Sequence, residues 1–517
     1  MNVQIDSRTP VIVGVGQYAE RIDDEGYRRL SAVQLAAEAA RAALTDTGSE
    51  PDAVRDALDT VAGVRQFENS TPQSIAPLGR ADNYPRAVAR LVGTDPAEAI
   101  LDVVGGQSPQ HLVTEMAASI AAGTRSAVLL VGSEAISTAR RFHDAPDRPD
   151  FSETVGGQLD DRGYGLEGMG SREHYRHGLV DAPPQYGLLE NARRDRLGQP
   201  ADAYARAMGD LFAPMTAGAA ANPFAAARTR RTAEELITVT ASNRMIADPY
   251  RRLLVARDLV NQAAALVLTS VETARKLGIP PERWVFLHGH AGLREPTLLA
   301  RPDLGRAPSA GLAAREALRV AGITVNEVAT FDLYSCFPIA VFNACEQLDL
   351  ATDDPRGLTV TGGLPYFGGP GNNYSMHAIA ETVDACRRAP ATYGFVGANG
   401  GSLTKYSVGV YCTTPRQWVP DRSAALQAEY EAQGAVEVTT APHGPARIES
   451  YTVRYERNRL RGIIIGRGQD ERRFLANAAE NDTELLDMLC SGDAIGAPIR
   501  VHAGEDRNMA TLASASA

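Results

Sequence analysis

Apolar runs of strand length alternate with amphipathic helical patterns from the N-terminus to about Thr414. Pro10–Val15, Ile100–Val104 and Ala127–Val131 have the continuous apolar character of buried strands. Ser31–Asp46 is rich in alanine, the best helix former, and its apolar residues recur at helical spacing. Strands that alternate with helices are typical of parallel sheets covered by helices, so the pattern predicts an α/β fold.

The order of these elements recurs in the second half of the chain. Ala39–Gly48, in the first long helix, aligns with Ala313–Gly322. Two further pairs align in the same order, namely Gly105–Ser108 with Gly368–Gly371, each before a helix, and Val131–Ser133 with Val396–Ala398. Several matches in one order indicate an internal duplication.

Two regions fall outside the duplicated pattern. Residues 139–230 hold a glycine-rich run and an arginine cluster, and we interpret them as an insertion over the core, with His174 and His177 at its surface. Ala446–Tyr455 alternates like a half-buried strand, which predicts a separate β-rich, OB-like domain at the C-terminus. The expected domains are residues 1–138 with 231–275, the inserted 139–230, then 276–415, and finally 420–510.

Composition narrows the class of protein. The chain has 517 residues, more than one hydrophobic core usually supports, and 44% of them are hydrophobic. Its net charge of −11 disfavours nucleic acid as a ligand. The early apolar run Val11–Val15 is too short to span a membrane, and no signal peptide is visible. Five cysteines without metal-ligand spacing are typical of a cytoplasmic protein with reduced thiols, and we expect no metal site.

One loop concentrates the residues that suit a binding site. Thr361–Tyr374 contains five glycines and two prolines, and a helical pattern follows it directly. A glycine-rich loop that leads into a helix presents backbone N–H groups and the positive end of the helix dipole. The segment is therefore either an active-site loop or a tight connector between two core elements.

Five segments of the sequence together match the motif positions of a known family. They are Asn222-Pro223-Phe224, Val260–Ala265, Asp332–Phe337, Thr361–Tyr374 and Ala398–Gly401. Through them, residues 8–415 resemble the thiolase superfamily, and in particular the sterol-carrier-protein-2-type thiolases. The resemblance implies a duplicated, five-layered αβαβα fold with an inserted loop domain. It also implies acyltransferase chemistry on coenzyme A thioesters in lipid metabolism. Small OB domains accompany some such enzymes as partner proteins, which makes the C-terminal domain a candidate accessory module.

The residues that perform thiolase chemistry are replaced in this chain. The family's nucleophilic cysteine belongs at the start of the helix after the first glycine-rich loop, where this sequence has Gly105–Pro109. The family's catalytic histidine falls at Gly369, and its other His or Asn falls at Tyr334. Its second cysteine falls near Ala398 or Asn399. We therefore expect ordinary thiolysis and Claisen condensation to be absent.

Several polar residues remain candidates for the pocket, with no catalytic role assigned to any of them. They are Tyr334, Ser335, Cys336, Ser108, Asn372, Asn373 and Asn399. Tyr334 and the three asparagines could hydrogen-bond a thioester carbonyl or a pantetheine amide, or could satisfy loop backbone groups. Ser108 is expected to cap its helix, and Cys336 to pack in the core.

Coenzyme A or an acyl-CoA is the expected ligand, with no tightly bound cofactor. Arg228, Arg230 and Arg231 could pair with its phosphates, or could form a solvated basic surface. Gly368 and Gly369 would approach the ligand through their backbone. Two functions stay open, an acyl-CoA acyltransferase with altered chemistry and a non-catalytic acyl-CoA-binding or scaffolding protein. A homodimer is one option for its assembly.

Overall fold

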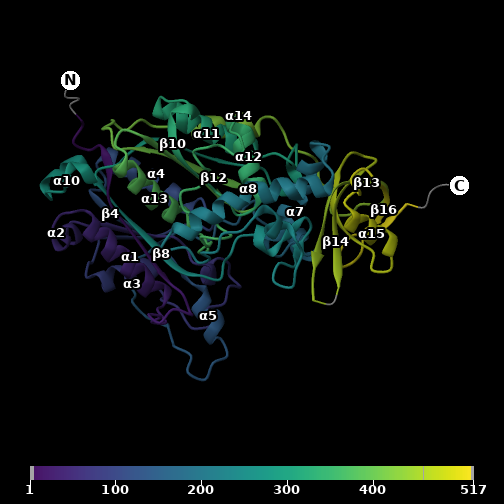
Figure 1. Cartoon of the computed structure of the whole chain (residues 1–517), viewed down its shortest axis with the longest axis horizontal. Helices are drawn as coiled ribbons and strands as arrows, with labels where there is room; N and C mark the ends of the chain where they lie inside the picture. The colour runs from purple at the N-terminus through teal and green to yellow at the C-terminus, as the bar shows by residue number, and fades with distance from the viewer. Residues whose placement is uncertain (1–4, 458, 514–517) are drawn as a thin grey trace.

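The computed structural model describes residues 5–457 and 459–513, which form two stacked sheets with helices and a smaller domain at one end (Figure 1). The first sheet contains, in spatial order, β1 (Pro10–Glu20), β8 (Asn261–Ser270), β4 (Ala127–Ala135), β2 (Thr60–Gly63), β3 (Glu98–Leu101) and β5 (Asp160–Asp161). The second contains β10 (Val328–Leu333), β11 (Tyr393–Gly400), β12 (Lys405–Cys412) and β9 (Phe286–Arg294).

Helices form three layers around the two sheets. The middle layer, which touches both sheets, consists of α4 (Ser108–Ala122) and α13 (Tyr374–Arg388). The first sheet is covered on its outer face by α1 (Ala32–Asp46) and α3 (Tyr84–Val92), with α2 (Pro51–Asp56) and α10 (Val271–Lys276) beside them. The second sheet is covered by α11 (Pro308–Ala321), α12 (Pro338–Leu348) and α14 (Ser423–Glu431). The order of layers is therefore αβαβα, as expected.

Strand order confirms the internal duplication. In the first sheet β1, β8, β4 and β2 are neighbours, and in the second β9, β12, β11 and β10 stand in the same places. The pairing directions also agree, because β1–β8 and β9–β12 are antiparallel while β2–β4 and β10–β11 are parallel. Both sheets are mixed rather than purely parallel. The reason is that the strand closing each half, β8 or β12, returns between two others in the opposite direction.

Each half also repeats one close contact between a helix and a strand. A Cβ atom added at Gly14 in β1 would overlap the carbonyl oxygen of Ala43 in α1. A Cβ atom added at Gly289 in β9 would overlap the carbonyl oxygen of Ala317 in α11 in the same way. Ala43 and Ala317 are aligned residues of the repeat, so both glycines let a helix backbone approach its sheet.

The helices of the insertion begin just before residue 139 and end just after residue 230. They are α5 (Ile136–Phe142), α6 (Arg172–Arg176), α7 (Ala182–Arg196), α8 (Ala201–Ala221) and α9 (Ala233–Ile237). The expected surface position of His174 and His177 is wrong, since both are buried. His177 Nε2 accepts a hydrogen bond from the backbone N–H of Asn508, so the C-terminal domain covers it.

The C-terminal domain is a closed five-stranded barrel. Its strands are β13 (Gly444–Tyr455), β14 (Leu460–Gly468), β15 (Arg473–Ala478), β16 (Pro498–His502) and β17 (Met509–Leu512), with α15 (Thr483–Ser491) before β16. Pairing runs from β13 through β14, β15, β17 and β16 back to β13, and only β15–β17 is parallel. This Greek-key closure confirms the expected OB-like topology. A short hairpin, β6 (Met245–Ala247) and β7 (Tyr250–Arg251), extends the barrel sheet beyond β13.

The barrel is joined to the rest of the protein by buried polar contacts. Helix α7 lies along β13, as Figure 1 shows, and Asn191 Nδ2 on α7 donates to the carbonyl oxygen of Tyr451 at 3.0 Å. Arg473 of β15 is fully buried and pairs with Glu449 of β13 at 2.5 Å. Its guanidinium also donates to the carbonyl oxygens of Leu299 and Arg301 in the second half. One short segment of the core, Leu299–Arg301, is therefore tied to this barrel arginine.

Helix α14 packs on the second sheet although the expected boundary at residue 420 would place it with the barrel. Among residues 5–457 and 459–513, no helix combines the length and the apolar character needed to cross a membrane.

Candidate functional site

The two glycine-rich loops of the duplicated halves meet at the ends of α4 and α13. The backbone N–H of Gly105 donates to Asn372 Oδ1 at 3.0 Å, and Asn372 Nδ2 donates to the carbonyl oxygen of Arg65 at 2.7 Å. Ser375 Oγ donates to the carbonyl oxygen of Gly106 at 2.6 Å. Asn372 therefore joins the loops and satisfies their backbone, which is the structural alternative of the two open for it.

Asp332, at the end of β10, holds the start of the loop 361–374. Its carboxylate accepts hydrogen bonds from the Thr359 hydroxyl at 2.8 Å, the Thr361 backbone N–H at 3.2 Å and the Tyr374 hydroxyl at 3.0 Å. Burial raises the pKa of Asp332 to about 6, against the lowering effect of these donors. The loop is therefore fixed at both ends, because Tyr374 is also the first residue of α13.

Ser108 does not cap its helix as expected. It is the first residue of α4, after Gln107, and its side chain is fully buried. Its hydroxyl donates to Asp102 Oδ2 at 2.6 Å, and His111 Nδ1 lies 3.3 Å from the same oxygen. Burial alone would raise the pKa of Asp102, but the hydrogen bonds from His111 and Ser108 outweigh it and lower the pKa. Because the carboxylate lies between them, the imidazole is not placed to take the serine proton.

Cys336 belongs to a buried hydrogen-bond cluster centred on Tyr186 of α7. The Tyr186 hydroxyl donates to the carbonyl oxygen of Gly401 at 2.7 Å and accepts from Asn399 Nδ2 at 2.8 Å. The Cys336 thiol donates to the same hydroxyl at 3.3 Å. Burial raises the pKa of Cys336 to about 12, so the thiol stays protonated at neutral pH. A relocated cysteine nucleophile therefore finds no support here, and the expected packing role fits.

Tyr334 fills the space between the first glycine-rich loop and the end of β11. A Cβ atom at Gly106 would collide with the Tyr334 hydroxyl and would lie 2.5 Å from the carbonyl oxygen of Asn399. The Tyr334 ring packs edge-on against Tyr374, with centroids 5.4 Å apart. Tyr334, where the resemblance leads us to expect the family's His or Asn, thus lies directly on the first glycine-rich loop.

The other pocket candidates lie within the loops or pack against them. Ser335 is buried, and its Oγ accepts from the backbone N–H of Leu364 at 3.2 Å. Asn373 lies against Gly132, and neither of its amide atoms has a hydrogen-bond partner among the described residues. Gly369 donates its N–H to the carbonyl oxygen of Arg257 at 2.7 Å, and Gly368 packs on Gln262.

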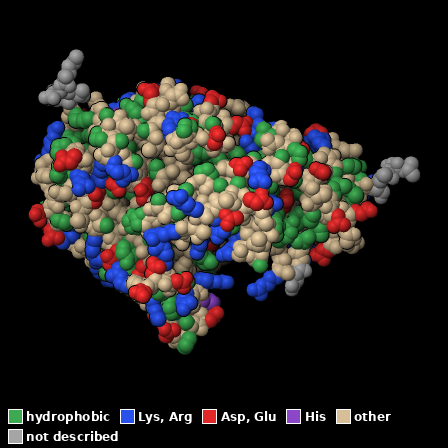
Figure 2. All heavy atoms as spheres, in the orientation of Figure 1, with side chains coloured by type: hydrophobic (Ala, Val, Ile, Leu, Met, Phe, Trp, Pro, Cys, Tyr) green, Lys and Arg blue, Asp and Glu red, His purple; other side chains and the backbone are tan. Residues whose placement is uncertain are grey.

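A basic cleft opens next to Gly368 and Gly369. Its volume is about 950 Å³, its opening to solvent included, and it is lined by the ends of β1 and α5 and the start of β8. Its lining contains four arginines and three acidic residues, and Arg21 pairs with one of these acids, Asp24, at 3.1 Å. The arginines are Arg21, Arg140, Arg141 and Arg257, the other acids are Glu20 and Asp23, and Phe224 and Gln262 form part of the wall. Within the described part of the chain, the guanidinium groups of Arg140, Arg141 and Arg257 have no ion pair or hydrogen bond. Figure 2 shows basic and acidic side chains side by side over the lower middle of the viewed face, where α5 lies.

The three arginines that the sequence suggested as one cluster, Arg228, Arg230 and Arg231, do not share one site in the structure. Arg228 and Arg21 both donate to the carbonyl oxygen of Pro223, so Arg228 lies at the edge of the basic cleft. Arg231 lies 3.8 Å from Glu235 and donates its backbone N–H to Thr216 Oγ1. Arg230 is exposed.

Two residues of the site were missed by sequence reasoning. Tyr186 lies in the insertion and has no motif around it. Lys405 is one of only two lysines in the chain, a compositional signal that could have found it. Its ammonium donates to the carbonyl oxygens of Val104 and Gly165, and burial lowers its pKa to about 8. Lys405 therefore fixes the backbone immediately before Gly105.

Comparisons with known proteins agree with the fold described above. A family described as the additional C-terminal domain of thiolase-like protein type 1 matches residues 425–506. A solved structure described as a monomeric SCP2-thiolase like protein type 1 from Mycobacterium smegmatis is 52% identical, with a TM-score of 0.85, and the match covers 98% of this chain and all of that one. No curated protein matches the chain.

More distant structures share the fold. The Ltp2-ChsH2(DUF35) aldolase is 19% identical with a TM-score of 0.57, and the match covers 78% of this chain and 98% of that one. The dimeric peroxisomal thiolase of Saccharomyces cerevisiae is 14% identical, with the same TM-score and the same coverage.

Proposed function

Because the chain belongs to the family of SCP2-thiolase-like proteins of type 1, we propose that it binds acyl-CoA thioesters without forming an acyl-cysteine. The fold and the loop positions of the superfamily are retained, while the groups that attack a thioester are not. Thiolysis and Claisen condensation through a covalent cysteine are therefore outside its activity.

The observation that carries this proposal is the arrangement of Gly106, Tyr334 and Cys336. The loop that would hold the nucleophile has no thiol, and the Tyr334 phenol lies on it. Cys336, the cysteine in the neighbouring loop, is buried, with a pKa of about 12. A thiol that is protonated at pH 7 and has no base beside it is a poor nucleophile.

The basic cleft supplies what a coenzyme A phosphate needs. Guanidinium groups bind phosphate oxygens through planar, bidentate hydrogen bonds, and those of Arg140, Arg141 and Arg257 are not engaged elsewhere in the described residues. Arg228, at the cleft edge, keeps its proposed role. The cleft wall includes Gln262, against which Gly368 packs.

Isothermal titration calorimetry with free coenzyme A tests the ligand. We expect binding that weakens at least tenfold in the triple variant Arg140→Ala, Arg141→Ala, Arg257→Ala. Arg472→Ala, which removes an exposed arginine of the distant barrel, is the matched control and should bind as the wild type does. Equal affinity in the triple variant and the control would show that the phosphates do not use this cleft.

A thiolysis assay with acetoacetyl-CoA tests the missing chemistry. We expect turnover at background level in the wild type and in Cys336→Ala. Turnover well above background that is lost in Cys336→Ala would overturn the proposal. The second candidate, an acyltransferase with altered chemistry, would instead show acyl transfer that survives Cys336→Ala. A homodimer and a cytoplasmic location remain predictions for this chain, although the relative from Mycobacterium smegmatis is described as monomeric.

A further inference from the structure

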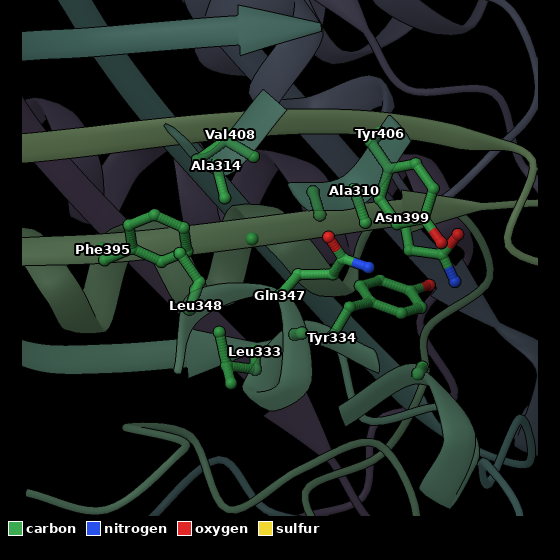
Figure 3. A pocket seen from close by; sticks show the side chains of 14 residues that line it. Ala310, Ala314, Leu333, Tyr334, Gln347, Leu348, Phe395, Asn399, Tyr406 and Val408 are labelled. Atoms are coloured by element: carbon green, nitrogen blue, oxygen red, sulfur yellow. The ribbon is translucent and has the colours of Figure 1, made fainter. Parts of the chain in front are cut away.

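A cleft apart from the site described above lies at one end of the C-terminal barrel, where β14 begins and β15 ends. Its volume is about 270 Å³. Pockets for drug-sized ligands hold about 300–1,000 Å³, so this cleft admits a smaller organic molecule. The cavity around Tyr334, Asn399 and Tyr406 beneath α11 and α12, shown in Figure 3, has a volume of only about 40 Å³, which is room for a few water molecules. The barrel cleft is therefore the better place for a ligand outside the proposed coenzyme A site.

Three arginines line the barrel cleft together with one acidic residue, Glu480. Arg459 directly precedes β14, Arg461 belongs to it, and Arg507 precedes β17. Glu456, next to the cleft, lies 2.6 Å from Arg459 and 3.4 Å from Arg461, and Glu480 lies 3.1 Å from Arg507. Within this group three cations face two carboxylates, which leaves one positive charge without a partner.

The ion pairs of the cleft leave most guanidinium donors free. The Arg461 side chain is only 19% exposed, and among the described residues its guanidinium has no hydrogen bond. Arg507 donates one hydrogen bond, to Glu480, whose side chain is 74% exposed. A pair that is exposed to this degree is weak, so an anion of the ligand can replace the Glu480 carboxylate. Planar guanidinium groups suit phosphate oxygens, which accept two parallel hydrogen bonds.

Contacts with the insertion hold the cleft in shape. A Cβ atom added at Gly178 would lie 3.0 Å from Cδ and from Nη1 of Arg461, so this side chain packs on the backbone of the insertion. Asn477, in the cleft lining, donates to the carbonyl oxygen of Gly462 at 3.0 Å and to that of His177 at 3.1 Å. Because the arginine and the cleft wall are already fixed, a ligand has few side chains to order when it binds.

The rest of the lining decides what kind of molecule carries the anion. Leu460, Ala478, Ala479 and Leu486 form an aliphatic wall. Among the described residues, no aromatic side chain belongs to the lining. Barrels of this type that bind single-stranded nucleic acid stack bases on aromatic side chains, and this cleft offers no such surface. The lining therefore favours a compact, non-aromatic molecule over a nucleotide chain.

We propose that this cleft binds a phosphate monoester of a small, non-aromatic molecule. Its phosphate oxygens accept hydrogen bonds from Arg461 and Arg507, and its organic part lies against Leu486 and Ala478. A phosphate monoester carries about 1.5 to 2 negative charges at pH 7. One charge offsets the uncompensated arginine, and the remainder replaces the carboxylate of Glu480, which turns into solvent. No residue of the basic cleft takes part, so this inference goes beyond the proposed function and does not depend on it.

Isothermal titration calorimetry with ribose 5-phosphate tests the cleft, with ribose as the uncharged comparison. We expect ribose 5-phosphate to bind and ribose to show no heat of binding. The double variant Arg461→Ala, Arg507→Ala should weaken binding at least tenfold, because it removes both charged donors. Arg447→Ala, which removes an exposed barrel arginine outside the cleft, is the matched control and should bind as the wild type does.

Glu480→Gln tests the same cleft in the opposite direction. It removes the carboxylate that competes with the phosphate for Arg507, so ribose 5-phosphate should bind about two- to fivefold more tightly. This variant is informative even if the double variant fails to fold. Weaker or unchanged binding by Glu480→Gln would overturn the inference, and so would equal binding by the double variant and Arg447→Ala.

Two further ligands test the part of the molecule beyond the phosphate. AMP, which adds an aromatic base, should bind no more tightly than ribose 5-phosphate, and a tenfold gain would contradict a non-aromatic ligand. Inorganic phosphate should bind at least fivefold more weakly than ribose 5-phosphate, because it makes no contact with the aliphatic wall. Equal affinity of the two would rule out a site for an organic molecule.

Coenzyme A separates this inference from the proposed function. The double variant of the barrel should still bind coenzyme A, and the triple variant of Arg140, Arg141 and Arg257 should still bind ribose 5-phosphate. If coenzyme A fails to bind the wild type while ribose 5-phosphate binds, the proposed function fails and the barrel site stands. If coenzyme A binds and ribose 5-phosphate does not, the barrel site fails and the proposed function stands.

Discussion

At the scale of single residues, the candidate site is a set of polar groups that form hydrogen bonds with one another. Ser108 is bound to Asp102, and Cys336 and Asn399 are bound to Tyr186. Each group that could attack a carbonyl is buried and is held in its neutral or hydrogen-bonded form.

Alkylation distinguishes a buried thiol from a reactive one. With a pKa of about 12, Cys336 has a thiolate fraction of about 10⁻⁴ at pH 8, and its thiol is also out of reach of solvent. Treatment of the folded protein with iodoacetamide at pH 8, followed by peptide mass spectrometry, should label the exposed Cys490 and leave Cys336 unmodified. Labelling of both at similar rates would contradict the burial of Cys336.

His377 provides a pH-dependent test of burial. It is fully buried, close to Phe367 of the loop 361–374, and burial lowers its pKa to about 3. The imidazole therefore lies inside the protein, on the buried side of α13. Between pH 6.5 and pH 3 the unfolded chain binds a proton at this residue and the folded chain does not. Its contribution to stability is thus present above pH 6.5 and is lost as the pH falls.

We expect urea unfolding of the wild type between pH 6 and pH 4 to lose up to about 1.4 kcal/mol per pH unit more than His377→Gln does. The measurement is the free energy of unfolding at several pH values in that range. Identical slopes for the two proteins would mean that the imidazole becomes protonated in the fold.

At the scale of elements, the duplication produces the same close contact between a helix and a sheet in both halves of the core. Gly14 with Ala43 and Gly289 with Ala317 are equivalent contacts, and each brings a helix backbone against a strand. The repeat is therefore visible in the spacing between backbones as well as in the alignment of α1 with α11.

Gly289→Ala tests this close approach. The added methyl group would overlap the Ala317 carbonyl, and overpacking of this kind costs about 1–3 kcal/mol. Gly292→Ala is the matched control on the same strand, because its nearest atom is 3.4 Å away. We expect a lower melting temperature for Gly289→Ala and little change for Gly292→Ala. An equal effect of both would indicate a general intolerance of alanine in β9.

At the scale of the whole molecule, the barrel is part of one structure with the core. It contacts the insertion through α7 and the second half through Arg473, and the hairpin of β6 and β7 extends its sheet. The same helix α7 contributes Tyr186 to the candidate site. The position of the barrel and the packing at the site therefore depend on one helix.

Arg473→Ala should loosen the barrel from the core. The change leaves Glu449 with Arg467 alone and frees the carbonyls of Leu299 and Arg301, and breaking a buried pair costs about 3–5 kcal/mol. Arg472→Ala, whose exposed pair with Asp470 is worth about 0–1 kcal/mol at most, is the neighbouring control. Limited proteolysis should cut Arg473→Ala faster between residues 413 and 443. Cleavage at the wild-type rate would show that other contacts hold the barrel.

Much of the fold was readable because it depends on local patterns. Apolar runs, the alanine-rich helices and the repeated Gly-Gly loops predict the elements and the duplication, and both are present. The expectation of parallel sheets was too simple, because strand direction depends on which strands become neighbours. Ser108 shows the same limit at a single residue. Its position after a glycine-rich loop predicts that it caps the helix. In the structure its hydroxyl instead donates a hydrogen bond to Asp102, six residues earlier.

The sequence by itself leads us to expect that the thiolase nucleophile and histidine are missing, because that expectation depends only on which residue stands at each matching position. It also determined the duplicated α/β core and the β-rich C-terminal domain, whose periodicities are local. Only the tertiary structure decided that Cys336 is held protonated and that Tyr334 lies on Gly106. It also decided that Arg257, which precedes β8, lines one cleft with two arginines of α5, none of which has an ion pair among the described residues. These facts depend on burial and on contacts between residues far apart in the chain, which no local pattern records.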